Sequence, residues 1–524
     1  MRYLIILFIS YIFYGCAQFV PPTGGPTDQA EPKLLGSDPV SKTKNFKGRT
    51  INMEFDEYID ITALKQELLI IPDPNSLYVI KQKDKNVKLI FDKDFADSTT
   101  YTFNFRNGIK DLSERNPSKN LKIVFSTGPE IDSLKLTGTI IDLQNKQPVL
   151  DALVGLYKKD TIPFGKKKPD YFIKTDSSGK YEFENIKADK YFLMAFTDKN
   201  QNLLYDQKNE NIAFKKDSIV LNQNKTIDTL ETYSANFTKN RIKKSISRES
   251  EFVLQLDKPI KSASINIQDS ALVYNYDKLN INVFKLSSPK TDTTLTQIIL
   301  TDSLNISDTI SQKIYFSSPL KTKRKIQSFT ANSNIKNGQE LTKNLKFNFL
   351  FQYPITRFDS SKVIFKTDTL QIEKPNYKWI SKNNLEVSLT TKAKQQTEII
   401  FPSNILENYK GDTNSIFAIK NPILGPDDLG TMEGNTITDK GTKIAQLINE
   451  DSGLVTDTQV FTNKFYFKNI IPGSYLVKII FDENQNGIWD PGNIKTLKLP
   501  ERVLISKESI RVRANFELKD QKIE

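Results

Sequence analysis

The sequence predicts an all-β protein: tandem antiparallel β-sandwich domains, arranged as an extended multi-domain chain. The first observation is alternation, since apolar and polar residues take turns through 51–55, 101–105 and 385–389. Such runs, bounded by clusters of Asn, Asp, Gly, Ser and Lys, are typical of half-buried strands in sandwiches. The second observation is internal repetition. Helical periodicity is weak and confined to 62–69 and 442–448.

The N-terminus predicts export and lipidation. Met1 and Arg2 precede an apolar run that ends at Gly15, and Cys16 follows as the only cysteine of the 524 residues. A charged start, a short apolar run and a small residue before the cut are typical of a secretory signal. We therefore expect a lipoprotein signal peptide at 1–15, an acylated Cys16 anchored in outer-membrane lipid, and a flexible tether at 16–32.

Two alternatives apply to this segment. One is an ordinary membrane anchor, but a run of about a dozen apolar residues is short for a span. The other is a signal peptide that is cleaved without lipidation, which the bulky residues before Gly15 favour. The breaker-rich stretch at 21–27 favours a tether instead.

Composition restricts the chemistry. There is no histidine, which excludes Ser-His-Asp and Cys-His catalysis and His-ligated zinc. Carboxylate-only chemistry remains open, but no acidic pair is marked for it. The formal net charge is +12, with lysines scattered along alternating strands as on solvated β faces. We expect no enzyme activity, no required cofactor and no nucleic-acid partner.

Repeats divide the chain into domains, and its length allows three to five. Residues 183–198 match 467–482 at a constant offset, which defines homologous modules at 132–232 and 428–518. A weaker repeat relates 101–111 to 398–407 and places sandwiches at 33–128 and 327–424. The segment 236–325 is β-rich and pairs with neither type.

Motifs in the first half carry a family resemblance. Residues 37–39, 51–58, 99–105, 109–111, 116–117 and 125–127 resemble the bacterial Ig-like domain of the S-layer (SbsA) type. Gly138, 175–183 and 186–191 resemble carboxypeptidase-regulatory-like or Cna-B-like sandwiches. Together with Cys16 and its tether, the arrangement resembles Ig-like-domain lipoproteins of the Bacteroidota. The resemblance implies spacers and binding platforms but no particular activity.

One repeated motif indicates a candidate metal site. The two modules share the pattern D-x-N-x-N-x-x-x-D, which matches positions 1, 3, 5 and 9 of an EF-hand-like calcium loop, with a backbone carbonyl at position 7. The candidate ligands are Asp198, Asn200, Asn202, Leu204 and Asp206, and Asp482, Asn484, Asn486, Ile488 and Asp490.

The pattern departs from that loop at two places. The bidentate Glu of position 12 is missing, because Asn209 and Asn493 stand there, and Leu203 replaces the glycine found at Gly487. We expect a weak structural calcium site. The alternative is a polar turn whose Asn and Asp side chains cap their own backbone.

These observations predict a non-enzymatic, lipid-anchored outer-membrane protein that acts as a structural, scaffolding or accessory subunit of an envelope assembly. Its expected partners are membrane lipid, through Cys16, and outer-membrane proteins; the sequence does not assign it to the periplasmic or the cell-surface face. An alternative is a surface glycan-binding or adhesive lipoprotein, which exposed Tyr and Trp on one sheet face would favour. A third class is a carboxylate-dependent hydrolase.

Overall fold

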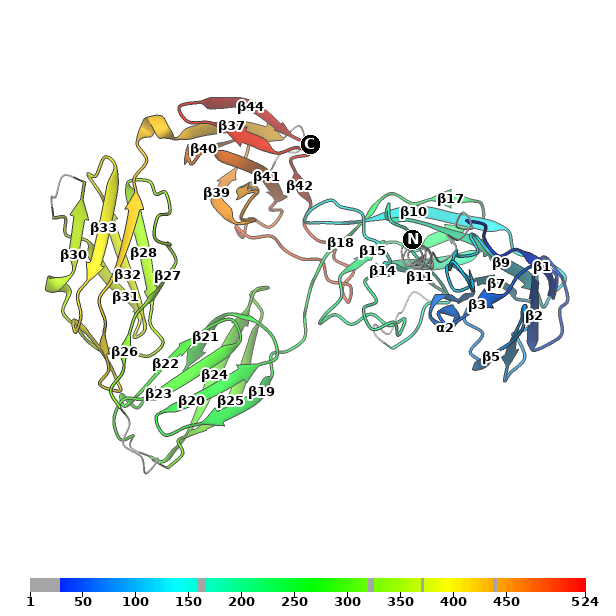
Figure 1. The fold of residues 1–524 in the computed structure, drawn as a ribbon, viewed down its shortest axis with the longest axis horizontal. Coiled ribbons are helices and arrows are strands. Elements are labelled where there is room, and N and C mark those ends of the chain that lie inside the picture. Colours follow the sequence, from blue (N-terminus) through cyan, green and yellow to red (C-terminus); the bar gives the residue numbers. More distant parts are fainter. Residues whose placement is uncertain (1–28, 159–165, 290, 319–324, 369–371, 437–440) are drawn as a thin grey trace, which may run out of the picture.

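The computed structural model describes residues 29–158, 166–289, 291–318, 325–368, 372–436 and 441–524 (Figure 1). Nearly all its regular structure is strand, and the prediction of an all-β chain of tandem sandwiches is confirmed. The predicted signal peptide and Cys16 lie outside the described residues. Within the described part, no helix is long and apolar enough to cross a membrane. We name the sandwiches predicted at 33–128, 132–232, 236–325, 327–424 and 428–518 domains A, B, X, A′ and B′. In the structure, B extends to Ala235, X begins at Ile242 after the linker 236–241, and B′ runs from Pro426 to Ile523.

Domain A packs a four-stranded sheet, β1-β2-β6-β5, against a three-stranded sheet, β4-β7-β9. Inward-facing residues of both sheets, among them Phe55, Leu89 and Phe103, are completely buried. The elements are β1 (Leu34–Asp38), β2 (Thr50–Phe55), β3 (Ile59–Asp60), α2 (Leu64–Glu67), β4 (Leu69–Ile71), β5 (Tyr78–Lys83), β6 (Asn86–Phe91), β7 (Thr100–Asn104), β8 (Lys110–Asp111) and β9 (Lys122–Ser126). The short helix α2 lies where the 62–69 periodicity indicates one.

Domain B consists of two packed sheets. In the first, β10 pairs with β13 on one side and with the short strands β17 and β18 on the other; the second has the order β12-β11-β14-β15, with β16 also paired to β14. Strands β17 and β18 run parallel to β10, and the other pairs are antiparallel. The strands are β10 (Leu134–Asp142), β11 (Leu153–Tyr157), β12 (Tyr171–Lys174), β13 (Lys180–Ile186), β14 (Asp189–Phe196), β15 (Ile212–Phe214), β16 (Ile219–Leu221), β17 (Lys225–Thr226) and β18 (Leu230–Thr232). All of β11 is buried, so its sheet is covered on both faces.

Domain X repeats the topology of domain A. Its sheets β19-β20-β23-β22 and β21-β24-β25 follow the strand order of β1-β2-β6-β5 and β4-β7-β9. The strands are β19 (Ile242–Ser247), β20 (Glu251–Leu256), β21 (Ile260–Ile265), β22 (Leu272–Tyr276), β23 (Asn280–Lys285), β24 (Thr293–Asp302) and β25 (Ser307–Tyr315). The segment that sequence comparison leaves unpaired is thus a third sandwich of the A type.

Domain A′ has the same two sheets, β27-β28-β32-β31 and β30-β33-β36. A further sheet, β26-β35-β34-β29, contains the pair β29-β34, the counterpart of β3-β8 in domain A. The elements are β26 (Ser328–Phe329), β27 (Asn332–Ser333), β28 (Asn344–Leu350), β29 (Ile355–Phe358), η1 (Ser360–Lys362), β30 (Ile364–Thr367), β31 (Asn376–Ser381), β32 (Asn384–Thr390), β33 (Gln396–Phe401), β34 (Leu406–Asn408), β35 (Thr413–Asn414) and β36 (Phe417–Pro422).

Domain B′ repeats domain B, with sheets β40-β37-β44 and β39-β38-β41-β42 and with β43 beside β41. The elements are η2 (Pro426–Asp428), β37 (Gly430–Thr436), β38 (Lys443–Asn449), β39 (Val455–Phe461), β40 (Lys464–Ile470), β41 (Gly473–Phe481), β42 (Val503–Ile505), β43 (Ile510–Val512) and β44 (Glu517–Ile523). The helical periodicity at 442–448 is a wrong indication, because this segment is strand β38. Its apolar residues point to two faces, and both faces are covered.

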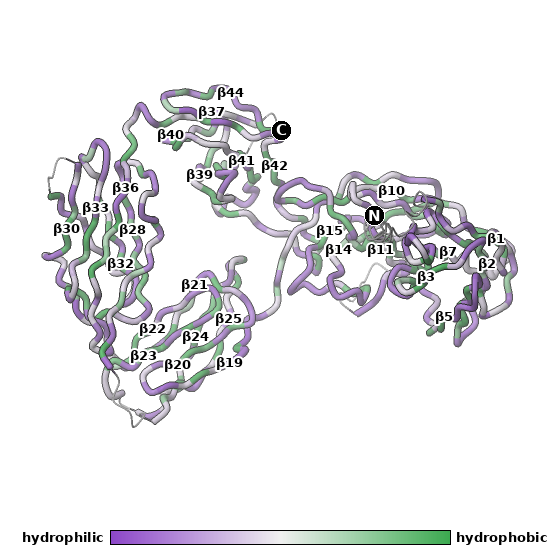
Figure 2. The backbone as a smooth tube through the Cα atoms, viewed as in Figure 1, coloured by the Kyte–Doolittle hydropathy of each residue, from purple (hydrophilic) through white to green (hydrophobic). Residues whose placement is uncertain are grey.

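The last domain returns to the second, so that B, X, A′ and B′ form a closed circuit with domain A outside it (Figure 1). Apolar residues of B′, including Ile444 and Ile480, belong to the hydrophobic cluster of B. Along the strands, hydrophilic and hydrophobic positions alternate in Figure 2, as sandwich packing requires.

Candidate functional site

The first acidic loop, 198–206, follows strand β14 and is held by its own side chains. Asp198 accepts backbone N–H groups from Asn202 at 3.1 Å and Leu203 at 3.0 Å. Asn202 accepts the N–H of Leu204 at 2.7 Å. Leu203 takes a left-handed φ of 64°, close to the 77° of Gly487 at the same place in the second loop. The two loops therefore share one backbone course despite the leucine.

A residue outside the predicted set closes this loop. Glu210 is 1% exposed and accepts the N–H of Lys199 at 3.0 Å and that of Asp206 at 2.8 Å. Burial raises the pKa of the Glu210 carboxyl above its ordinary value, against the lowering effect of the two N–H donors. One buried carboxylate thus joins the start of the loop to its end.

The second loop, 482–490, has the same construction. Asp482 accepts the N–H groups of Asn486 at 3.0 Å and Gly487 at 2.8 Å. Glu501 is 3% exposed and accepts the N–H of Glu483 at 3.0 Å and that of Asp490 at 2.9 Å. Burial raises its pKa as well. Glu501 is therefore the structural counterpart of Glu210.

The side-chain oxygens of the remaining predicted ligands already accept hydrogen bonds within or next to their loops. Asn200 and Asn484 accept N–H groups of Asn202 and Asn486, and Asn486 accepts that of Ile488. The side-chain amides of Asn484 and Asn486 donate to Asp490. Over the residues that the structure covers, no three His, Cys, Asp or Glu side chains are grouped so that they could hold a metal ion. Calcium binding stays a prediction. In this conformation the loops are turns held together by hydrogen bonds from their own side chains.

Charged and polar contacts fix the junction between domains A and B. Glu184 of B bonds both Lys122 of A and Lys135 of B. Arg106 of A pairs with Asp151 of B at 3.0 Å. The lysines lower the pKa of the Glu184 carboxyl, with Lys122 the largest cause.

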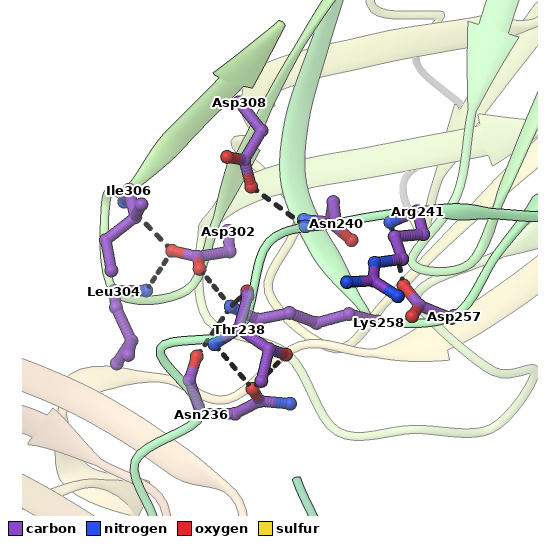
Figure 3. Close-up of polar contacts among 10 residues, drawn as sticks. All are labelled: Asn236, Thr238, Asn240, Arg241, Asp257, Lys258, Asp302, Leu304, Ile306 and Asp308. Atoms are coloured by element: carbon purple, nitrogen blue, oxygen red, sulfur yellow. Dashed lines mark hydrogen bonds and ion pairs between the residues drawn. The ribbon is translucent and has the colours of Figure 1, made fainter. Parts of the chain in front are cut away.

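A buried ion pair fixes the linker between domains B and X (Figure 3). Lys258 and Asp302 pair with side chains 6% and 0% exposed. Lys258 also donates to the carbonyl oxygens of Asn236 at 2.6 Å and Thr238 at 3.1 Å, both in the linker. The other oxygen of Asp302 accepts two backbone N–H groups of the following turn, one of them from Leu304. Every charge of this cluster is therefore compensated, as burial demands.

Aromatic rings fix the junction between domains X and A′. The Tyr409 hydroxyl lies 3.0 Å from the Ser250 hydroxyl of X, and the Tyr409 ring lies 5.6 Å from that of Phe284. Lys410 sits 3.7 Å above the Tyr353 ring. Together with the linker pair, these contacts join consecutive domains by defined side-chain interactions.

Comparison with known proteins identifies one domain family. Residues 28–127 match the family described as bacterial Ig-like domain. No curated protein matches the chain. Among solved structures, surface layer protein SbsC, domains 1–6, is 10% identical with a TM-score of 0.16, over 92% of this chain and 66% of that one. The N-terminal part of SbsC is 12% identical with a TM-score of 0.15, over 32% of this chain and 40% of that one.

Two other structures are similar at the same level. One is a Bacteroides ovatus protein, SGBP-B of a mixed-linkage glucan utilization locus in complex with a heptasaccharide, 9% identical with a TM-score of 0.16, over 66% of this chain and 90% of that one. The other is BcpA, the major pilin subunit of Bacillus cereus, 12% identical with a TM-score of 0.14, over 75% of this chain and 99% of that one. Overlaps this loose do not transfer those proteins' functions.

Proposed function

We propose that this chain is a non-enzymatic structural protein of the bacterial envelope, anchored in the outer membrane by acylation of Cys16 and serving as a scaffolding or accessory subunit of a protein assembly. The observation that carries the proposal is that defined side-chain contacts join consecutive domains. Side-chain contacts fix A to B, B to X, and X to A′. Because these contacts hold consecutive domains at set positions, the chain has the property that a spacer or scaffold requires.

The anchoring is tested by fractionation of cells that express the native chain or Cys16→Ser. The native protein should partition with the outer membrane and carry acyl chains in N-terminal mass spectrometry. The variant should leave the membrane fraction or keep an unprocessed N-terminus. A variant that still co-sediments with the outer membrane would contradict anchoring through Cys16.

The scaffold role is tested by purifying the intact protein from native membranes in mild detergent and identifying what co-purifies. Stoichiometric recovery of an outer-membrane protein supports the scaffold. Recovery of the protein alone would contradict a stable assembly and favour the adhesive alternative.

A hollow in domain A′ favours glycan binding as a second candidate function. Trp379 is 36% exposed and lies edge-on to Phe358 at 5.9 Å. With Arg357 and Lys382 they line a hollow of about 370 Å³ between β29 and β31. An aromatic face beside charged donors is chemistry that suits a sugar ring. Trp379→Ala should abolish any binding on a glycan array, whereas Trp489→Phe, in B′, should not.

The weak structural calcium predicted for the two loops is tested on the full chain by calorimetric titration. Binding would require the Asn484 and Asn486 amides to turn their oxygens inward. A heat of binding that Asp482→Asn removes would support it. A flat titration at millimolar calcium would contradict it, since weak extracellular sites saturate at about that concentration.

A further inference from the structure

Domain B′ has an apolar surface outside its own core. Ile444 on β38 and Ile480 on β41 are cross-strand partners, 1% and 3% exposed. Neither belongs to the core of B′, where Val477 and Ile479 lie. Both instead join the hydrophobic cluster of B, together with Val503 of β42. The outer face of this sheet is therefore buried by another domain.

The segment in which the two repeats differ contributes to the same contact. Glu210 follows Asp206 by four residues, whereas Glu501 follows Asp490 by eleven. The longer segment in B′ holds Ile494, which is 5% exposed and joins the cluster of B. It also holds Gly492, where an added Cβ would lie 2.4 Å from the Tyr233 hydroxyl of B. The insertion thus brings backbone and an apolar side chain against B.

The edge of this contact is polar and incompletely packed. Lys478 of B′ donates to the side-chain oxygen of Gln144 of B. Beside it lies a cavity of about 790 Å³, lined by Lys146 and Glu231 of B and by Glu450 and Arg502 of B′. An apolar centre surrounded by a polar rim is typical of an interface between separate proteins rather than of a domain core.

We propose that the B–B′ contact is a reversible clasp, and that when it opens, the B′ face around Ile444 and Ile480 binds domain B of a second copy of this chain. The inference rests on the proposed structural role and names a partner for it. The complementary surface is already known, since it is B itself. Exchanging an identical element between copies needs no new contact.

The contact also has the right symmetry for assembly. B′ presents its sheet face and insertion, whereas B presents Tyr233 and Gln144, so the two surfaces differ. A contact of this heterologous kind leaves one free surface at each end and propagates into rings or open chains. Within one chain, domains X and A′ hold B and B′ next to each other, so exchange needs dense packing of copies, which anchoring in one membrane supplies.

The first test opens the clasp. Ile480→Asp places a charge in the B–B′ contact and leaves the B′ core intact, so small-angle scattering of dilute protein should show a larger radius of gyration. Val460→Asp is the matched control, since Val460 lies in the same sheet and is 57% exposed. Hydrogen exchange of β41 verifies that B′ remains folded. Unchanged dimensions for a folded Ile480→Asp protein would overturn the clasp.

The second test detects the second copy by crosslinking. Gln144→Cys and Lys478→Cys chains, each with Cys16→Ser, are mixed at high concentration after mild urea opening and treated with a short bismaleimide. The mixed pair should yield covalent dimers well above the background of Lys81→Cys mixed with Lys478→Cys, because Lys81 is exposed on domain A. Dimers at background level would overturn exchange between copies. Neither test uses lipidation, so failure here is distinct from failure of the anchoring proposal.

Discussion

At the scale of single residues, Glu210 and Glu501 show how a carboxylate can hold a loop without a metal. Each is almost fully buried and accepts one N–H from the beginning of its loop and one from the end. Because both carboxylate oxygens are used, two charge-assisted bonds offset part of the desolvation, which still raises the pKa of each carboxyl.

Glu501→Gln should loosen the second loop. The amide nitrogen cannot accept, so one of the two N–H groups is left without a partner at a cost of about 1–3 kcal/mol. Hydrogen exchange over 482–490 should quicken accordingly. Glu483→Gln is the matched control, since that side chain is exposed, and it should leave exchange unchanged. Equal effects of the two substitutions would contradict the lock.

A larger loss of stability is expected when the Lys258–Asp302 ion pair is broken. Lys258→Met removes one partner and leaves Asp302 charged in a buried site, which costs about 3–5 kcal/mol. The thermal transition of domain X should fall, and proteolysis in the 236–241 linker should rise. Lys261→Met is the control, because Lys261 bonds Asn305 at the exposed surface. A linker that stays resistant in Lys258→Met would show that the pair does not hold it.

At the scale of elements, alternation predicted the strands wherever one face meets solvent. Strands 51–55 and 385–389 alternate because one side of their sheet is the core and the other is less buried. The rule failed at β38, where Ile444 faces B and Leu447 faces the core of B′. Burial on both faces erases the period of two, and the spacing then resembles a helix.

Repeat detection had a similar limit. Domain X has the strand order of A, but packing constrains only which positions are apolar, so sequence identity does not survive. The lock residue Glu501 was missed because the insertion after Asp490 shifts it away from the offset of the repeat. The acidic pattern itself could be read from sequence, since its residues lie next to one another.

A glycine in β37, the middle strand of the sheet β40-β37-β44, gives a prediction for this scale. A Cβ at Gly434 would lie 2.4 Å from the Gln521 carbonyl oxygen of β44 and equally near the Phe465 ring. Gly434→Ala should therefore displace β44 and destabilise B′ by about 1–3 kcal/mol, seen as faster hydrogen exchange over 517–523. Gly36→Ala in β1 meets nothing within 4 Å and should be tolerated. Protection of β44 in Gly434→Ala would refute the crowding argument.

At the scale of the whole molecule, different kinds of side-chain contact hold the different domain junctions. Apolar burial joins B to B′, and a buried ion pair and aromatic rings hold the linkers on either side of X. The A–B junction combines two kinds of contact, since Leu69 and Ile71 of A join the hydrophobic cluster of B, whereas Arg106–Asp151 and the pairs of Glu184 are partly exposed to solvent. The ionic part of this junction should therefore respond to salt and pH.

Acidification should loosen domain A from B. Lys122 and Lys135 hold the folded-state pKa of Glu184 below its ordinary 4.5. A carboxyl whose folded pKa is depressed contributes stability that is present above the ordinary value and is lost as pH falls through the folded pKa. Crosslinking between A and B should therefore weaken below about pH 4.5. It should also weaken in high salt at neutral pH, since the pairs are partly exposed.

Two substitutions separate Glu184 from the other carboxylates that titrate in this range. Glu184→Gln should loosen the junction already at pH 7 and flatten its pH response between about 5 and 3, because the titrating partner of both lysines is gone. Glu182→Gln is the control, since Glu182 pairs with Lys135 within B. If Glu184→Gln kept the full acid response, Glu184 would not be the group that makes this junction depend on pH.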